Sequence, residues 1–221
     1  MPKVIYGIYG ASGLGKEVMP LLRGVSKSKE NCYFIDDNQE LKILNGYKVL
    51  TLREFLKIKS DEYYVCVAIA NSKIRKKLTL KCLDNGVKLL NIKADNIIVL
   101  DEVEIDEGVI LSPFVTLTSN ITIGKSFHAN IYSYVAHDCV IGDYVTFAPA
   151  VKCNGNIVIE DHVYIGTGAI IKQGKPTKPL IIGEGATIAA GAVVTKSVPA
   201  GMTVFGNPAI ELTKENLKSR K

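Results

Sequence analysis

Three histidines, His128, His137 and His162, are the side chains of this 221-residue sequence that suit proton transfer near neutral pH. His137 differs from the other two because Asp138 follows it directly. A neutral imidazole can accept a proton from an attacking amine or alcohol, and an adjacent carboxylate can hold the ring in one tautomer. We therefore predict that His137 is a general base and that Asp138 is its partner. The alternative is a histidine and an acid on an ordinary solvated turn.

The segment that contains His137 repeats every six residues. From Val99 to Ile171 each sixth residue is apolar, without a slip of register. The pattern stops at residues 173–179 and resumes at Ile182. An amphipathic helix repeats at 3.6 residues and a half-buried strand at two, so a period of six predicts short strands that wind as a parallel β-helix with one inserted loop. His137 is the third residue of its hexad, at a turn, which predicts that its side chain points outward.

The first half of the chain alternates strand-like and helix-like segments. Apolar runs at residues 4–9, 32–35, 63–70 and 87–92 are separated by segments with helical spacing. This order predicts a small α/β domain with a parallel sheet that binds ligands at the carboxyl ends of its strands. The residues expected at that edge are Gly10, Ser12, Gly13, Leu14, Gly15, Asp36, Asp37, Asn71 and Arg75.

The glycine-rich turn at residues 10–15 is a weak signal by itself. Its spacing is G-x-x-G-x-G, whereas dinucleotide-binding enzymes have G-x-G-x-x-G. Backbone N–H groups at such a turn can bind a phosphate, but a tight turn without a ligand fits the residues as well. Pro20 predicts that the following helix starts late or kinks.

Composition excludes several classes of protein. Residues 1–96 carry 17 Lys/Arg against 10 Asp/Glu, whereas residues 97–221 carry 10 against 12. Aromatic residues are not interleaved with the basic ones, which argues against nucleic-acid binding. Five cysteines without C-x-x-C spacing indicate neither a disulfide framework nor a metal site, and favour the cytoplasm. No stretch approaches the ~20 apolar residues of a membrane span, so we expect no membrane insertion.

The two halves together resemble the sialic acid O-acetyltransferase and bacillosamine N-acetyltransferase family, a group of hexapeptide-repeat sugar acetyltransferases. The resemblance covers nearly the whole chain and rests on GASGLGKEV at residues 10–18, FIDD at 34–37, AIAN at 68–71 with Arg75, and VAHDCVIGD at 135–143. It implies a Rossmann-like nucleotide-sugar-binding domain at 1–96, a left-handed parallel β-helix acetyltransferase domain at 97–210 and a C-terminal tail at 211–221.

The resemblance also implies a reaction. Acetyl-CoA would donate its acetyl group, without a metal, to the 4-amino group of a nucleotide-linked 4-amino-4,6-dideoxyhexose used for bacterial surface polysaccharide. The active sites would lie between the subunits of a homotrimer, with His137 as the base. Gly155 would donate its backbone N–H to the developing oxyanion. Asn130 would lie near the reacting end of the sugar, or would alternatively be an asparagine in a left-handed turn.

Further residues are implied for the CoA arm. It is expected to follow the turns at Thr167, Gly168, Ala189 and Gly191, with Lys172 and Lys196 near its phosphates. Residues 173–179 would cover it, or would be a neutral insertion. Cys139 and Cys153 occupy inward positions of the repeat and are predicted to pack as small apolar residues, so we expect direct transfer without an acyl-enzyme.

Two other functions remain open. The same base could serve O-acetylation of sialic acid or of another sugar hydroxyl. A scaffold or nucleotide sensor without catalysis would also fit the repeat, although the outward His137 favours an enzyme. The sequence leaves the choice among GDP, dTDP and UDP sugars open.

Overall fold

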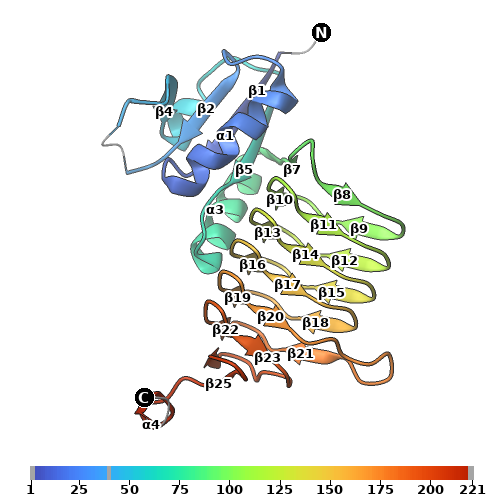
Figure 1. Ribbon diagram of the computed structural model, residues 1–221. Coiled ribbons are helices and arrows are strands. Elements are labelled where there is room, and N and C mark those ends of the chain that lie inside the picture. Colours follow the sequence, from blue (N-terminus) through green and yellow to red (C-terminus); the bar gives the residue numbers. More distant parts are fainter. Residues whose placement is uncertain (1–2, 39–40, 219–221) are drawn as a thin grey trace. The chain divides into compact units, whose positions relative to one another are not determined.

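The computed structural model describes residues 3–38 and 41–218, which form two compact units (Figure 1). The first unit is Met1–Lys93 together with Glu107–Ile110. The second is Ala94–Asp106 together with Leu111–Lys221.

The first unit is built on a parallel sheet, as the alternation of its segments predicted. β1 (Val4–Tyr9) pairs in parallel with both β2 (Cys32–Ile35) and β5 (Glu62–Val67). β4 (Tyr47–Leu50) and β6 (Lys88–Leu89) extend the sheet to the order β4-β2-β1-β5-β6. β3 (Ile43–Leu44) forms an antiparallel hairpin with β4 that the sequence pattern does not predict. The carboxyl ends of β1, β2 and β5 therefore share one edge.

Helices cover both faces of this sheet. α1 (Gly13–Ser26) buries Val18 and Leu22 against one face. α2 (Leu52–Phe55) and α3 (Ser72–Asp84) pack against the other face, where Phe55 and Cys82 are buried. α1 begins at Gly13, within the glycine-rich segment, and runs through Pro20, so of the two predicted effects of Pro20 the late start is wrong.

The second unit is a stack of short parallel strands, which confirms the predicted parallel β-helix (Figure 1). Three sheets run along it. The first contains β10 (Ile110–Leu111), β13 (His128–Ala129), β16 (Thr146–Phe147), β19 (Tyr164–Ile165), β22 (Thr187–Ile188), β24 (Thr203–Phe205) and the antiparallel β25 (Ile210–Glu211). The second contains β8 (Ile98–Val99), β11 (Thr116–Leu117), β14 (Tyr134–Val135), β17 (Lys152–Cys153), β20 (Ile170–Ile171) and β23 (Val193–Val194). The third contains β9 (Val103–Ile105), β12 (Ile121–Ile123), β15 (Cys139–Ile141), β18 (Ile157–Ile159) and β21 (Leu180–Ile182). β7 (Ile92–Lys93) is the end strand of the first of these sheets, next to β10, and α4 (Lys214–Lys218) follows β25.

Each coil of the stack contains three hexads. Thr116 pairs with Tyr134, and Ile121 pairs with Cys139, so equivalent residues of neighbouring coils are 18 positions apart. Ile159 instead pairs with Ile182, 23 positions on, because the inserted loop adds five residues to that coil. From residue 111 to residue 171 the inward residues of the repeat stack from coil to coil and are buried, as Val135 and Cys153 are.

The corners between the strands have a left-handed backbone. A positive φ recurs at every sixth residue from residue 102 to residue 168, and most of these residues are not glycine. They include Asn120, Asp138 and Asn156, which occupy the same corner of three successive coils. This conformation is costly for residues other than glycine, asparagine and aspartate, so the winding of the stack must compensate for it.

Candidate active site

His137 and Asp138 lie at the corner between β14 and β15. The imidazole Nδ1 is 2.7 Å from Asp138 Oδ2, and both side chains are 47% exposed. His128 and His162 are buried, so His137 is the outward histidine, as its place in the hexad predicted. Because an ionised carboxylate only accepts hydrogen bonds, Nδ1 carries the proton in the neutral ring, and Nε2 is left as the basic atom.

Asp138 is held as an anion. Hydrogen bonds from His137 and then from Asn120 lower the pKa of its carboxyl group below the usual value. The amide Nδ2 of Asn120 donates to Asp138 Oδ1 over 3.2 Å. Sequence reasoning missed Asn120, although its position 18 residues before Asp138 was a signal that could have identified it.

Gly155 lies against the His137 ring, one coil further along. A Cβ on Gly155 would be 2.5 Å from both Cε1 and Nε2 of the imidazole and 2.9 Å from Nδ1. A real Cβ is essentially never this close to a non-bonded atom, so any residue other than glycine would force the ring to move from this position. The Gly155 carbonyl accepts a hydrogen bond from Gly174 N, whereas its N–H has no acceptor within residues 3–38 and 41–218.

The segment before Gly155 is fixed by side chains of two coils and a backbone carbonyl of a third. The Tyr134 hydroxyl donates to Asn154 Oδ1 over 2.8 Å, and Asn154 Nδ2 donates to the Ile171 carbonyl over 2.8 Å. The thiol of Cys139 is 3.2 Å from the Asn154 carbonyl oxygen. These contacts hold the backbone on which the imidazole rests.

Cys139 and Cys153 are buried free thiols. Both are thus inward, as their repeat positions predicted. The hydrogen bond between the two thiols, with Cys153 as donor, and burial raise the pKa of Cys153 well above its usual value, whereas the same hydrogen bond lowers the pKa of Cys139. Both sulfur atoms are buried and out of reach of a thioester, which argues against an acyl-enzyme.

Asn130 donates its side-chain Nδ2 to the Phe147 carbonyl over 2.8 Å. Its own backbone N–H donates to the same oxygen. It is not among the residues with a positive φ, so the alternative interpretation as a left-handed turn residue is wrong. The side chain instead satisfies a carbonyl of the next coil and is partly exposed.

The residues predicted to contact CoA fall into two groups. Thr167 and Gly168 precede β20, and Ala189 and Gly191 precede β23 at the equivalent corner of the next coil, where Gly191 N donates to the Thr167 carbonyl over 2.8 Å. The second group contains Lys172, which directly follows β20 and directly precedes the inserted loop.

The second group, Lys172 and Lys196, lines a basic pocket. It has a volume of about 620 Å³ and is lined by Lys172 and Lys196 together with Lys175 and Lys178 of the inserted loop. Sequence reasoning named the first two lysines and missed the other two. Gly174 of the inserted loop also lines this pocket, and its backbone N–H donates to the carbonyl of Gly155. We call Gly155, on which the His137 ring lies, the imidazole platform.

In the first unit, the glycine-rich turn connects β1 to α1 as predicted. A Cβ on Gly15 would be 1.9 Å from the Gly10 carbonyl oxygen, so the turn closes too tightly for any other residue there. Ser12 is the N-cap of α1, and its side chain makes no capping hydrogen bond. Gly13 begins the helix, and a Cβ there would meet nothing within 4 Å, whereas Leu14 packs against the core.

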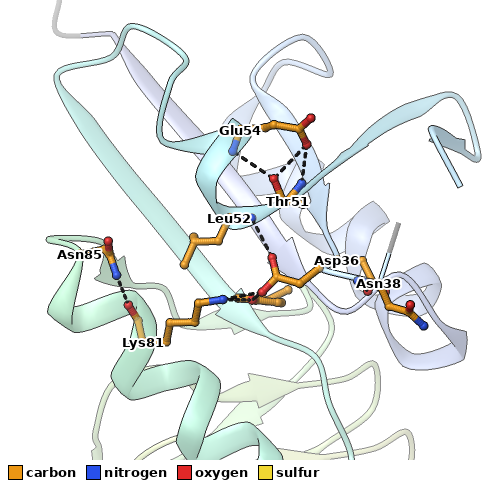
Figure 2. Close-up of polar contacts among 9 residues, drawn as sticks. Asp36, Asn38, Thr51, Leu52, Glu54, Lys81 and Asn85 are labelled. Atoms are coloured by element: carbon orange, nitrogen blue, oxygen red, sulfur yellow. Dashed lines mark hydrogen bonds and ion pairs between the residues drawn. The ribbon is translucent and has the colours of Figure 1, made fainter. Parts of the chain in front are cut away.

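The two acids after β2 point in different directions. Asp36 faces the turn, where its carboxylate accepts from the N–H groups of Ala11 (3.4 Å) and Asn38 (3.0 Å). Asp37 instead accepts from the Lys81 ammonium, the Tyr9 hydroxyl and the Leu52 N–H. Figure 2 labels Asp36, Leu52 and Lys81 in this region. Burial alone would raise the pKa of the Asp37 carboxyl, but these hydrogen bonds together hold it below its usual value.

Asp37 therefore ties β1, α2 and α3 together. Both of its oxygens have partners within the fold, but the side chain is still 40% exposed, so its predicted role in binding a ligand stays a prediction.

Asn71 and Arg75 likewise have structural partners. The Asn71 side chain caps α3 by accepting from the N–H groups of Lys73 and Ile74. Arg75 is fully buried, and its Nη1 donates to the carbonyls of Ile69 (2.8 Å) and Ala70 (3.2 Å). Arg75 thus stabilises the turn after β5 from a buried position, and its predicted role in binding a ligand stays a prediction.

Comparison with known proteins agrees with these features. Residues 6–82 match the family described as PglD N-terminal domain. Over 216 residues the chain is 54% identical to GDP-perosamine N-acetyltransferase of Escherichia coli O157:H7, covering 95% of this chain and 97% of that protein. The chain belongs to the GDP-perosamine N-acetyltransferase family. It is therefore an acyltransferase enzyme, as His137 and the six-residue repeat suggested.

Solved structures place the fold of this acetyltransferase in the same group. WeeI from Acinetobacter baumannii AYE has 62% sequence identity and a TM-score of 0.93, over 95% of this chain and all (100%) of that one. A mutant of perosamine N-acetyltransferase from Caulobacter crescentus, in complex with CoA and GDP-perosamine, has 25% identity and a TM-score of 0.83, over 95% and 97% of the two chains. Within the part of this enzyme that the structure describes, no helix is long and apolar enough to cross a membrane.

Proposed function

We propose that this acetyltransferase transfers the acetyl group of acetyl-CoA to the 4-amino group of GDP-perosamine, in the biosynthesis of a bacterial surface polysaccharide. The observation that carries the proposal is the corner where the His137–Asp138 pair rests on Gly155, in a chain 54% identical to a GDP-perosamine N-acetyltransferase. The product would be an amide on the sugar and free CoA.

The residues divide the chemistry among themselves. Acetyl-CoA supplies the electrophilic thioester carbonyl. Nε2 of His137 accepts a proton from the amine as the C–N bond forms, and Asp138 stabilises the resulting imidazolium through Nδ1. The N–H of Gly155 donates to the oxygen that becomes negative. When the C–S bond breaks, the imidazolium can return its proton to the departing CoA sulfur.

The remaining binding roles follow from charge and position. The glycine-rich turn and Asp36 would hold the nucleotide part of the substrate, with the positive end of α1 facing a phosphate. Lys172 and Lys196 would bind phosphates of CoA, assisted by the inserted loop. The catalytic corner is convex and half exposed, so we expect a second subunit of a left-handed β-helix homotrimer to close the site.

The test is an assay of CoA thiol release with a panel of acceptors. Purified enzyme is given acetyl-CoA with GDP-perosamine, with dTDP- and UDP-linked 4-amino sugars, and with free and CMP-linked sialic acid. We expect the highest kcat/KM with GDP-perosamine and loss of turnover in His137→Asn. Preference for sialic acid would instead establish O-acetylation, and full turnover by a folded His137→Asn variant would overturn the mechanism.

A further inference from the structure

We propose that Asn120 is a positioning residue that acts on the His137 base through Asp138. This inference rests on the proposed function, because it deepens the role of the same corner. Asn120 lies on the coil before the catalytic pair and does not touch the imidazole in the hydrogen bonds of the described residues.

The carboxylate of Asp138 has a separate partner for each oxygen. Oδ2 accepts from the imidazole Nδ1 over 2.7 Å, and Oδ1 accepts from the Asn120 amide over 3.2 Å. A carboxylate held at one oxygen can rotate about its Cβ–Cγ bond, whereas one held at both oxygens from different coils has a fixed plane. The orientation of the imidazole is therefore set from the preceding coil.

The winding of the chain brings the two residues together. Asn120 and Asp138 are 18 positions apart at the same corner, with φ values of 57° and 56°. Their backbones thus have the same conformation, and the side chains leave the stack in the same direction, one coil apart. Asparagine suits this position for two reasons: it tolerates the left-handed conformation, and its amide is a donor without charge.

The Asn120–Asp138 hydrogen bond matters for the position of the His137 ring because Gly155 leaves the ring little space to move on the opposite side. Gly155 approaches Cε1 and Nε2 so closely that even a methyl group would not fit. A small rotation of the Asp138 carboxylate would tilt the ring on this platform and move Nε2 away from the reacting amine. Reaction rates fall steeply with such displacements, by about 10²-fold for 1 Å.

The test compares Asn120→Ala and Asn120→Asp with a matched control, Glu102→Gln. Glu102 occupies the equivalent corner one coil earlier, has a positive φ as well, and makes no hydrogen bond to Asp138. We expect both Asn120 variants to lower kcat by about five- to tenfold, as for loss of one typical solvent-exposed hydrogen bond, with both KM values unchanged. Glu102→Gln should behave as wild type. In an Asp138→Ala background, Asn120→Ala should have no further effect.

An NMR measurement separates this inference from the proposed function. In enzyme labelled with ¹⁵N at histidine, the Nδ1–H resonance of His137 should broaden or exchange faster in both Asn120 variants and stay unchanged in Glu102→Gln. This readout needs no turnover, so it holds even if the acceptor panel shows that the substrate is wrong. If wild type is active and the Asn120 variants match Glu102→Gln in kcat and in the NMR signal, Asn120 does not position the base.

Discussion

Replacing Gly155 by alanine isolates the contact between the imidazole and the next coil. The φ of Gly155 is not in the left-handed region, so alanine can adopt the same backbone. The added methyl group would instead meet the His137 ring at 2.5 Å from Cε1 and Nε2. The substitution thus acts on the ring and leaves the coil intact.

The size of the effect follows from these distances. Ordinary contacts begin near 3.4 Å, so the ring must retreat by about 1 Å, which is enough to lengthen the 2.7 Å hydrogen bond to Asp138 and to displace Nε2. A displacement of this size typically lowers the rate about 10²-fold, or by roughly 2.7 kcal/mol of activation free energy. We expect kcat to fall by this factor while the melting temperature stays within a few degrees.

The assay is steady-state CoA release together with thermal unfolding. Gly24→Ala is the control, because a Cβ at Gly24 meets nothing within 4 Å and the residue lies in the interior of a helix. It should keep wild-type kcat. If Gly155→Ala retains more than half of the wild-type kcat, the close contact does not position the base, and the argument fails.

Three further predictions follow from other contacts. Tyr134→Phe removes the hydrogen bond to Asn154, so kcat should fall about fivefold at constant KM; an unchanged kcat would show that the platform is rigid without it. Lys172→Ala and Lys196→Ala should each raise the KM for acetyl-CoA several-fold with little change in kcat, and a raised KM for the sugar alone would assign this pocket to the other substrate. Asp37→Asn should lower the free energy of unfolding by about 1 kcal/mol, a modest value because Asp37 and Lys81 are partly exposed. Since folding lowers the pKa of Asp37, this stabilisation is present above the unfolded pKa of about 3.9 and is lost as the pH falls through the folded pKa, so urea unfolding at pH 7 and pH 3 should differ less in the variant.

The winding of the second unit could be predicted because its signal is local. Every coil repeats the same apolar positions, so the period of six, the break at residues 173–179 and the outward place of His137 are all visible in the sequence. The same holds for β1, β2 and β5 of the first unit and for the helices α1 and α3, whereas the β3–β4 hairpin and the short helix α2 were not predicted.

Partnerships between distant side chains could not be predicted in this way. Asp36 and Asp37 are chemically identical neighbours, and only the fold shows that one faces the turn while the other binds Lys81 and Tyr9. Arg75 looks like a surface cation of a lysine-rich helix, yet the turn after β5 encloses it. The pairing of Asn120 with Asp138 can be recognised in the sequence only when the coil length of 18 residues is known, because nothing in the hexad of Asn120 distinguishes it.

The inserted loop contributes residues of the basic pocket from a stretch of chain that is separate from the His137 ring and from Gly155. Its root is bonded to the catalytic coil, because Gly174 N donates to the Gly155 carbonyl and Leu180 N donates to the Asn156 carbonyl. Between these two anchors the chain leaves the winding and then re-enters the same sheet register. Substitutions, insertions or deletions in that stretch can alter the lysine-lined pocket without moving the His137 ring or Gly155. If this pocket binds CoA as proposed, the enzyme has a segment in which evolution or protein engineering can adjust affinity for the acetyl donor while the geometry of the chemical step is preserved.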